Sequence, residues 1–107
     1  MKKQDELIGK RARNSIASEV YVLRLFITGA SPNSVRAITN LSEICKTYLA
    51  GKFTLEVVDV YQQSAIATKE QIVALPLLVK KLPLPERRMI GDLSDTQKVL
   101  SALGVIL

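Results

Sequence analysis

The sequence of 107 residues contains one cysteine, Cys45, and no histidine. Without an imidazole base to activate a nucleophile, and without a second thiol, a catalytic triad, a Cys/His zinc site and an intramolecular disulfide are all excluded. Cys45 lies on the apolar stripe of a predicted helix, so we expect it to pack in the core, with a reactive thiol as the alternative. These residues predict a protein that is not an enzyme and needs no cofactor.

Four carboxylates, Asp59, Glu70, Asp92 and Asp95, are the remaining candidates for metal or acid–base chemistry. They fall on different predicted elements, so we do not expect them to form one site. Asp95 falls in the first turn of the last predicted helix, where a negative charge interacts favourably with the helix dipole. We therefore assign it a structural role.

Basic side chains give the sequence a formal net charge of +5. The excess is spread along the chain, whereas a nucleic-acid surface needs a concentrated stripe, and aromatic residues for base stacking are few. We do not expect a nucleic-acid partner, although a basic nucleic-acid-binding module stays as an alternative. The candidate partner-binding residues, each of which could instead be simply solvated, are Arg24, Arg36, Lys80, Lys81, Arg87 and Arg88.

The first half of the chain predicts a strand, a helix and a second strand. Residues 1–19 are polar and lack periodicity, which indicates a flexible basic N-terminal arm before a domain at 20–107. The run VYVLRLFIT (20–28) is typical of a central strand buried on both faces. Ser31 then predicts an N-cap before a helix of about 17 residues, and FTLEVVDV (53–60) predicts a parallel strand. The residues expected to face inward from this helix are Val35, Ile38, Leu41, Ile44, Cys45, Tyr48 and Leu49.

The second half predicts a short helix over 62–73, then LLVKKL (77–82) and RRMIG (87–91) as an antiparallel hairpin. Ser94 opens a capping-box pattern before the last helix. Inward residues are expected to be Ile66, Ile72 and Val73 in the short helix, and Val99, Leu100, Leu103, Ile106 and Leu107 in the last one. The order βαβαββα predicts a single thioredoxin-like α/β domain with a mixed four-stranded sheet.

The placement of one proline refines this prediction. Pro76 precedes a strand, as the cis proline of thioredoxin-like proteins does, so we expect a cis Leu75–Pro76 bond, with a trans strand-starting proline as the alternative.

No apolar run approaches the roughly 18 residues of a spanning helix, and residues 1–19 lack the apolar core of a signal peptide. We expect a soluble, cytoplasmic protein.

Three segments closely resemble the KaiB family of the bacterial circadian clock, namely YVLRLFITGASPNSVRAITNL (21–41), LEVVDV (55–60) and ALPLLVKKLPLPERRMIGDLSDTQKVL (74–100). The resemblance implies a non-catalytic adaptor that binds KaiC, a hexameric ATPase and autokinase, opposes the activator KaiA and promotes KaiC dephosphorylation. It also implies that several of the basic positions above lie at or near the KaiC contact. A thioredoxin-type redox protein is the rival reading.

The resemblance further implies two folds, because family members exchange a thioredoxin-like monomer for an alternative arrangement that assembles into tetramers. Self-association as a dimer or tetramer is therefore open. Glu56 stands where clock members usually carry Lys, which would reverse the charge of a contact there. Ala102 stands where the family commonly has Gly, and Gly104 stands where it commonly has Asp. Alanine in a helix interior is more favourable than glycine by about 1 kcal/mol, and Gly104 would destabilise the helix by a similar amount near its fraying end. We expect the net effect to favour the thioredoxin-like state.

Overall fold

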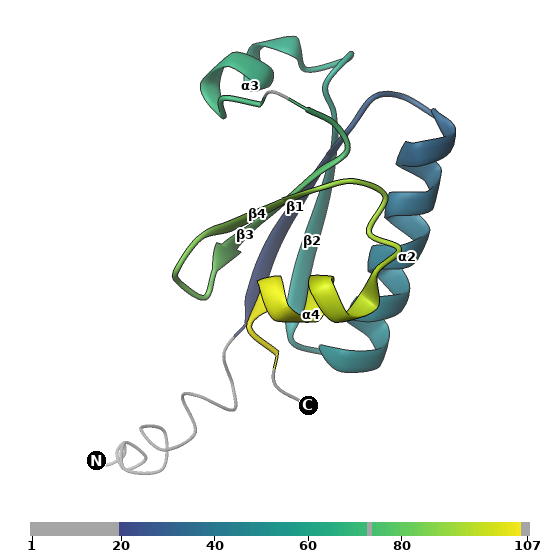
Figure 1. Cartoon of the computed structure of the whole chain (residues 1–107). Helices are drawn as coiled ribbons and strands as arrows, with labels where there is room; N and C mark the ends of the chain where they lie inside the picture. The colour runs from purple at the N-terminus through teal and green to yellow at the C-terminus, as the bar shows by residue number, and fades with distance from the viewer. Residues whose placement is uncertain (1–19, 73, 106–107) are drawn as a thin grey trace, which may run out of the picture.

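The computed structural model describes residues 20–72 and 74–105. The predictions for the arm at 1–19 and for Val73, Ile106 and Leu107 fall outside these residues. Within these residues the helices and strands follow one another in the predicted order βαβαββα (Figure 1). They are β1 (Tyr21–Ile27), α2 (Pro32–Tyr48), β2 (Phe53–Asp59), α3 (Ser64–Lys69), β3 (Leu77–Leu82), β4 (Arg87–Ile90) and α4 (Thr96–Leu103).

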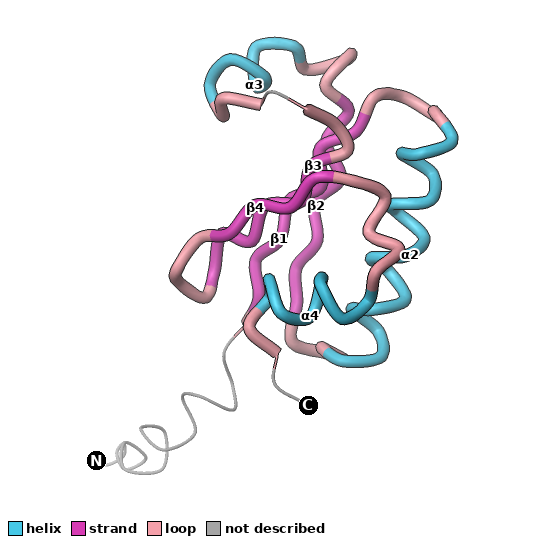
Figure 2. The backbone as a smooth tube through the Cα atoms, viewed as in Figure 1, coloured by secondary structure: helices cyan, strands magenta, loops and turns pink. Residues whose placement is uncertain are grey.

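The four strands form one mixed sheet in the order β2-β1-β3-β4 (Figure 2). β1 pairs with β2 in parallel, and with β3 antiparallel; β3 and β4 form the antiparallel hairpin. The predicted central position of β1 is confirmed, since it has a neighbour on each side and is buried on both faces. β2 and β4 are the edge strands.

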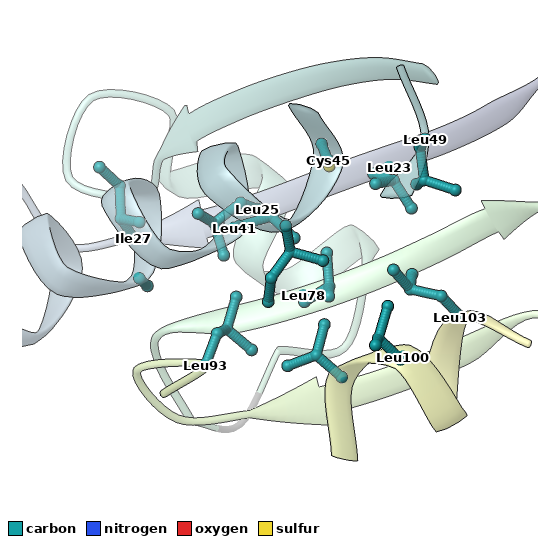
Figure 3. Packing of buried hydrophobic residues seen from close by; sticks show 13 residues of the cluster. Leu23, Leu25, Ile27, Leu41, Cys45, Leu49, Leu78, Leu93, Leu100 and Leu103 are labelled. Carbon is teal, nitrogen blue, oxygen red and sulfur yellow. The ribbon is translucent and has the colours of Figure 1, made fainter. Parts of the chain in front are cut away.

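Each face of the sheet carries its own apolar cluster. On one face α2 and α4 cover Leu23, Leu25 and Leu78, and Figure 3 shows Leu41 of α2 and Leu100 of α4 approaching these strands. On the other face the segment around α3 covers a smaller cluster with Phe26, Val58 and Val79 at its base. Strand residues alternate between the faces with a period of two, so neighbouring side chains in one strand enter different environments.

Local signals account for the start and end of α2. Ser31 is the N-cap, as predicted: its hydroxyl accepts from the Ser34 amide at 3.2 Å. Pro32 at the first helical position removes an amide that would have no helical partner. The inward stripe is shifted from the predicted one, because Ser34 is buried whereas Val35 and Tyr48 lie exposed at its flanks.

The last helix begins one residue later than the capping-box pattern predicts. Asp95, not Ser94, is its N-cap, with Oδ1 accepting from the Lys98 amide at 3.2 Å. The Ser94 amide instead donates to Asp92 Oδ1 at 3.1 Å, so Ser94 belongs to the turn before the helix. Gly104 is the C-cap with a φ of +81°, a left-handed conformation that glycine adopts without strain. The predicted destabilisation of the helix by Gly104 is therefore wrong, because Gly104 ends the helix and does not lie within it.

The segment between β2 and β3 is less helical than predicted, because α3 has only six residues. The chain leaves the helical conformation at Gln71, whose φ is +56°. Ile66 and Ile72 both pack against the second cluster, as expected. The Leu75–Pro76 bond is cis, which confirms that prediction. Within the described residues no helix is both long enough and apolar enough to cross a bilayer.

Candidate partner-binding surface

Strand alternation divides the basic residues of the β3–β4 hairpin between the two faces of the sheet. Lys80 lies directly opposite Arg87 on the face that α4 covers. Lys81 and Arg88, one residue further along each strand, point to the face that carries α3. Four basic residues that are close in the sequence are thus two separate pairs.

Lys80 is buried beneath the end of α4, with only 4 % of its surface exposed. Its Nζ donates to the Leu103 carbonyl at 3.5 Å, in the last turn of the helix. A cation there compensates the negative end of the helix dipole. Lys80 therefore supports the fold in this conformation, and we leave it out of the proposed surface.

Glu70 collects three of the predicted site residues on the α3 face. Its carboxylate accepts from Lys81 Nζ at 3.1 Å and from Arg24 Nη1 at 3.4 Å, and Arg88 Nη2 lies 3.9 Å away. The Glu70 side chain is 13 % exposed. The hydrogen bond from Lys81, with the charges of Lys81, Arg24 and Arg88, lowers the pKa of Glu70.

Two more carboxylates surround these cations. Glu56 lies opposite Arg24 in the parallel register and accepts from its Nε at 3.0 Å. Glu86 lies 3.8 Å from both Lys81 Nζ and Arg88 Nε. We call the whole set the sheet-face ion network; its members are Arg24, Glu56, Glu70, Lys81, Glu86 and Arg88. Three cations face three carboxylates, so this face is not a basic patch.

Arg88 also binds the main chain of the segment after α3. Its Nη2 donates to the Glu70 carbonyl at 2.6 Å and its Nη1 to the Gln71 carbonyl at 3.4 Å. These bonds fasten the connection between α3 and β3 onto the edge strand β4. Sequence reasoning did not pair Glu70 with these cations, because Glu70 and Arg24 are 46 positions apart and only the folded sheet brings them together.

Arg36 lies elsewhere, on the exposed side of α2. Its Nε is 3.3 Å from Asp92 Oδ2, and its guanidinium also contacts Asn33. Asp92 accepts hydrogen bonds from Ser94 as well, and these bonds, with a smaller effect of Arg36, lower the pKa of Asp92. Arg36 therefore ties α2 to the loop before α4.

Arg87 differs from the other five candidates. It is exposed on the edge strand β4, and within residues 20–72 and 74–105 it makes no ion pair or side-chain hydrogen bond. A guanidinium offers five N–H donors in a planar fork that suits carboxylates. Of the six predicted residues, Arg87 is the one whose side chain has no ion-pair or hydrogen-bond partner among the described residues, so its charge is available for an external contact.

The junction of β1 and α2, where a thioredoxin-like enzyme would carry its reactive thiol, holds serines. Ser31 Oγ donates to Ser34 Oγ at 2.8 Å, and Ser34 Oγ accepts from the Thr28 amide at 3.1 Å. Cys45 is buried further along α2, as predicted, and burial raises its pKa to about 11. The thiol is therefore protonated near neutral pH and enclosed, which disfavours the reactive alternative.

The carboxylates considered for a metal site have other roles. Asp59 accepts from the amides of Gly29 and Tyr61, and Asp95 caps α4. Across the described part of the chain, no three His, Cys, Asp or Glu side chains are grouped so that they could hold a metal ion.

Solved structures of similar shape define the fold. Chloroplastic thioredoxin z superposes with a TM-score of 0.64 at 16 % identity, covering 90 % of this chain and 89 % of that one. The N-terminal domain of Synechococcus elongatus SasA gives a TM-score of 0.66 at 24 % identity, covering 80 % of this chain and 85 % of that one. The chain therefore has a thioredoxin-like fold, with serines at the junction of β1 and α2.

Sequence comparison then gives the family. The KaiB domain model matches residues 24–105. The circadian clock oscillator protein KaiB of Prochlorococcus marinus subsp. pastoris is 44 % identical over 91 residues, 85 % of each chain. That of Synechococcus elongatus is 44 % identical over 88 residues, 82 % of this chain and 86 % of its own. The chain belongs to the KaiB family, a family of clock regulatory proteins.

Proposed function

We propose that this protein is a non-catalytic, cytoplasmic adaptor that binds a KaiC-type hexameric ATPase and autokinase and modulates its phosphorylation state. The observation that carries the proposal is the match to the KaiB domain over residues 24–105, which spans every strand and helix from the middle of β1 to the end of α4. The adaptor would act by occupancy, excluding a competing regulator from the ATPase ring.

The availability of Arg87 supports a role for β4 in this contact. The fork of an exposed arginine can bind a partner carboxylate without first breaking an internal ion pair. Arg24, Lys81 and Arg88 would have to leave the sheet-face ion network to do the same. We therefore assign Arg87 the direct contact and the other three a supporting role, with Arg36 as a separate contact on α2.

A pull-down with the KaiC-type ATPase of the same organism, in the presence of ATP, tests this assignment. The variant Arg87→Ala should lose about tenfold or more in affinity, because truncating an interface arginine commonly costs that much. Lys46→Ala, which removes an exposed cation on α2, is the matched control. Absence of binding by the unmodified protein across phosphorylation states would contradict the adaptor function.

We also propose that Ala102 favours the thioredoxin-like state over a tetrameric alternative. It lies in the last turn of α4, one residue before the end of the helix, where alanine favours the helix over glycine by up to about 1 kcal/mol. Light scattering after size exclusion should find a monomer, and Ala102→Gly should increase any larger species. A tetramer dominating the unmodified protein would contradict this proposal.

A further inference from the structure

The tip of the β3–β4 hairpin presents an aliphatic side chain to solvent. Leu84 is 75 % exposed and lies between Pro83 and Pro85, and Leu82 at the end of β3 is 46 % exposed. In Figure 1 the hairpin projects from the body of the domain, away from α2. Leu82, Leu84 and the neighbouring Pro85 are all exposed, and a contiguous exposed apolar surface, unlike a single exposed side chain, marks a protein–protein contact.

The surrounding chain restricts the conformations that this tip can adopt. Both prolines fix their own φ and lack an amide hydrogen, so the turn has few alternative backbone states. Below the tip, β3 and β4 form cross-strand pairs, of which the pair of Lys80 and Arg87 is nearest to the turn. Glu86 adds contacts to both strands through Lys81 and Arg88, each at 3.8 Å. Leu84 is therefore preorganised, and little conformational entropy would be lost when it is buried by a partner.

The charges around the tip determine which kind of partner surface can bind it. Lys81 and Arg88 are neutralised by Glu70 and Glu86, whereas Arg87, three residues after Leu84, carries an available positive charge. A complementary surface must then offer an apolar pocket for Leu84 and a carboxylate beside it for Arg87. The Asp92 and Asp95 carboxylates of this chain already accept hydrogen bonds from their own chain, so neither is a ready partner for Arg87 of a second copy.

We propose that the hairpin tip is an apolar anchor, with Leu84 inserting into an apolar pocket of a partner protein whose rim holds an acidic residue for Arg87. The pocket belongs to the KaiC-type ATPase if the function proposed above is right, and the inference rests on that function. Burial of Leu84 supplies the apolar contact area, and the ion pair of Arg87 with the acidic residue fixes the orientation of the hairpin in the pocket.

The test measures the affinity of three variants for the ATPase in the presence of ATP, with equal thermal unfolding as a check on folding. Leu84→Ser should weaken binding by about tenfold or more, and Leu84→Met, which keeps an apolar side chain of similar volume, should bind within about twofold of the unmodified protein. Val35→Ser removes a half-exposed apolar side chain on α2 and is the matched control.

The outcomes separate this inference from the proposed function. Normal binding by Leu84→Ser, or an equal loss in Val35→Ser, overturns the anchor and leaves the adaptor function standing. No binding by the unmodified protein overturns both. If the unmodified protein is an oligomer that Leu84→Ser converts to monomers, a second copy occupies the tip, and the proposed partner pocket is wrong.

Discussion

Replacing Glu70 with glutamine removes the central charge of the sheet-face ion network while keeping the shape of the side chain. The carboxylate has two contacts at hydrogen-bond distance, from Lys81 at 3.1 Å and Arg24 at 3.4 Å, and a longer one to Arg88 at 3.9 Å. The variant leaves three cations gathered around a neutral amide. We expect the segment after α3 to be held less firmly against the sheet.

The size of the effect follows from burial. A hydrogen bond to a charged group contributes about 1.5–3 kcal/mol where water is excluded, and an exposed ion pair about 0–1 kcal/mol. Glu70 is 13 % exposed, but Lys81, Arg24 and Arg88 are 29 %, 35 % and 37 % exposed, so water can replace much of what they lose. We expect Glu70→Gln to lower the free energy of unfolding by about 1–2 kcal/mol at neutral pH.

Urea denaturation followed by circular dichroism measures this difference, with Glu43→Gln on the exposed side of α2 as the control. The pKa of Glu70 is lowered in the folded protein, so its stabilisation is present above the pKa of the unfolded chain and is lost as pH falls through the folded pKa. The difference between Glu70→Gln and the unmodified protein should therefore shrink on acidification. Equal effects of the two variants, or a difference that stays constant with pH, would refute the reasoning.

Three further predictions concern α4 and the core. Asp95→Ala should lower the free energy of unfolding by about 1 kcal/mol through loss of the N-cap, and Ser94→Ala by much less; thermal unfolding compares them. Gly104→Ala should cost about 1 kcal/mol because its φ is +81°, and an unchanged midpoint would contradict the left-handed cap. Cys45, buried and with a pKa of about 11, should resist a thiol reagent at neutral pH until the chain is unfolded; rapid labelling of the folded protein would contradict its burial.

The elements could be predicted from the sequence because their signals are local. Ser31 and Pro32 define the start of α2, and the β-branched and aromatic run at 20–28 forms the inner strand. Cys45 falls on the buried stripe by its spacing alone. The start of α4 was predicted one residue early, since Ser94 and Asp95 are both good caps and only the turn at Asp92 decides between them.

The roles of the basic residues depended on the tertiary structure. Lys80 and Lys81 are neighbours in the sequence, yet α4 buries one while Glu70 pairs with the other, because a strand sends successive side chains to opposite faces. Arg24 contacts Glu70 only when the end of α3 packs on the face of the sheet to which the Arg24 side chain points. The sequence by itself determined which residues are charged and which elements carry them. Long-range packing decided which charges are neutralised and left Arg87 available, because pairing depends on distances that form only in the folded chain.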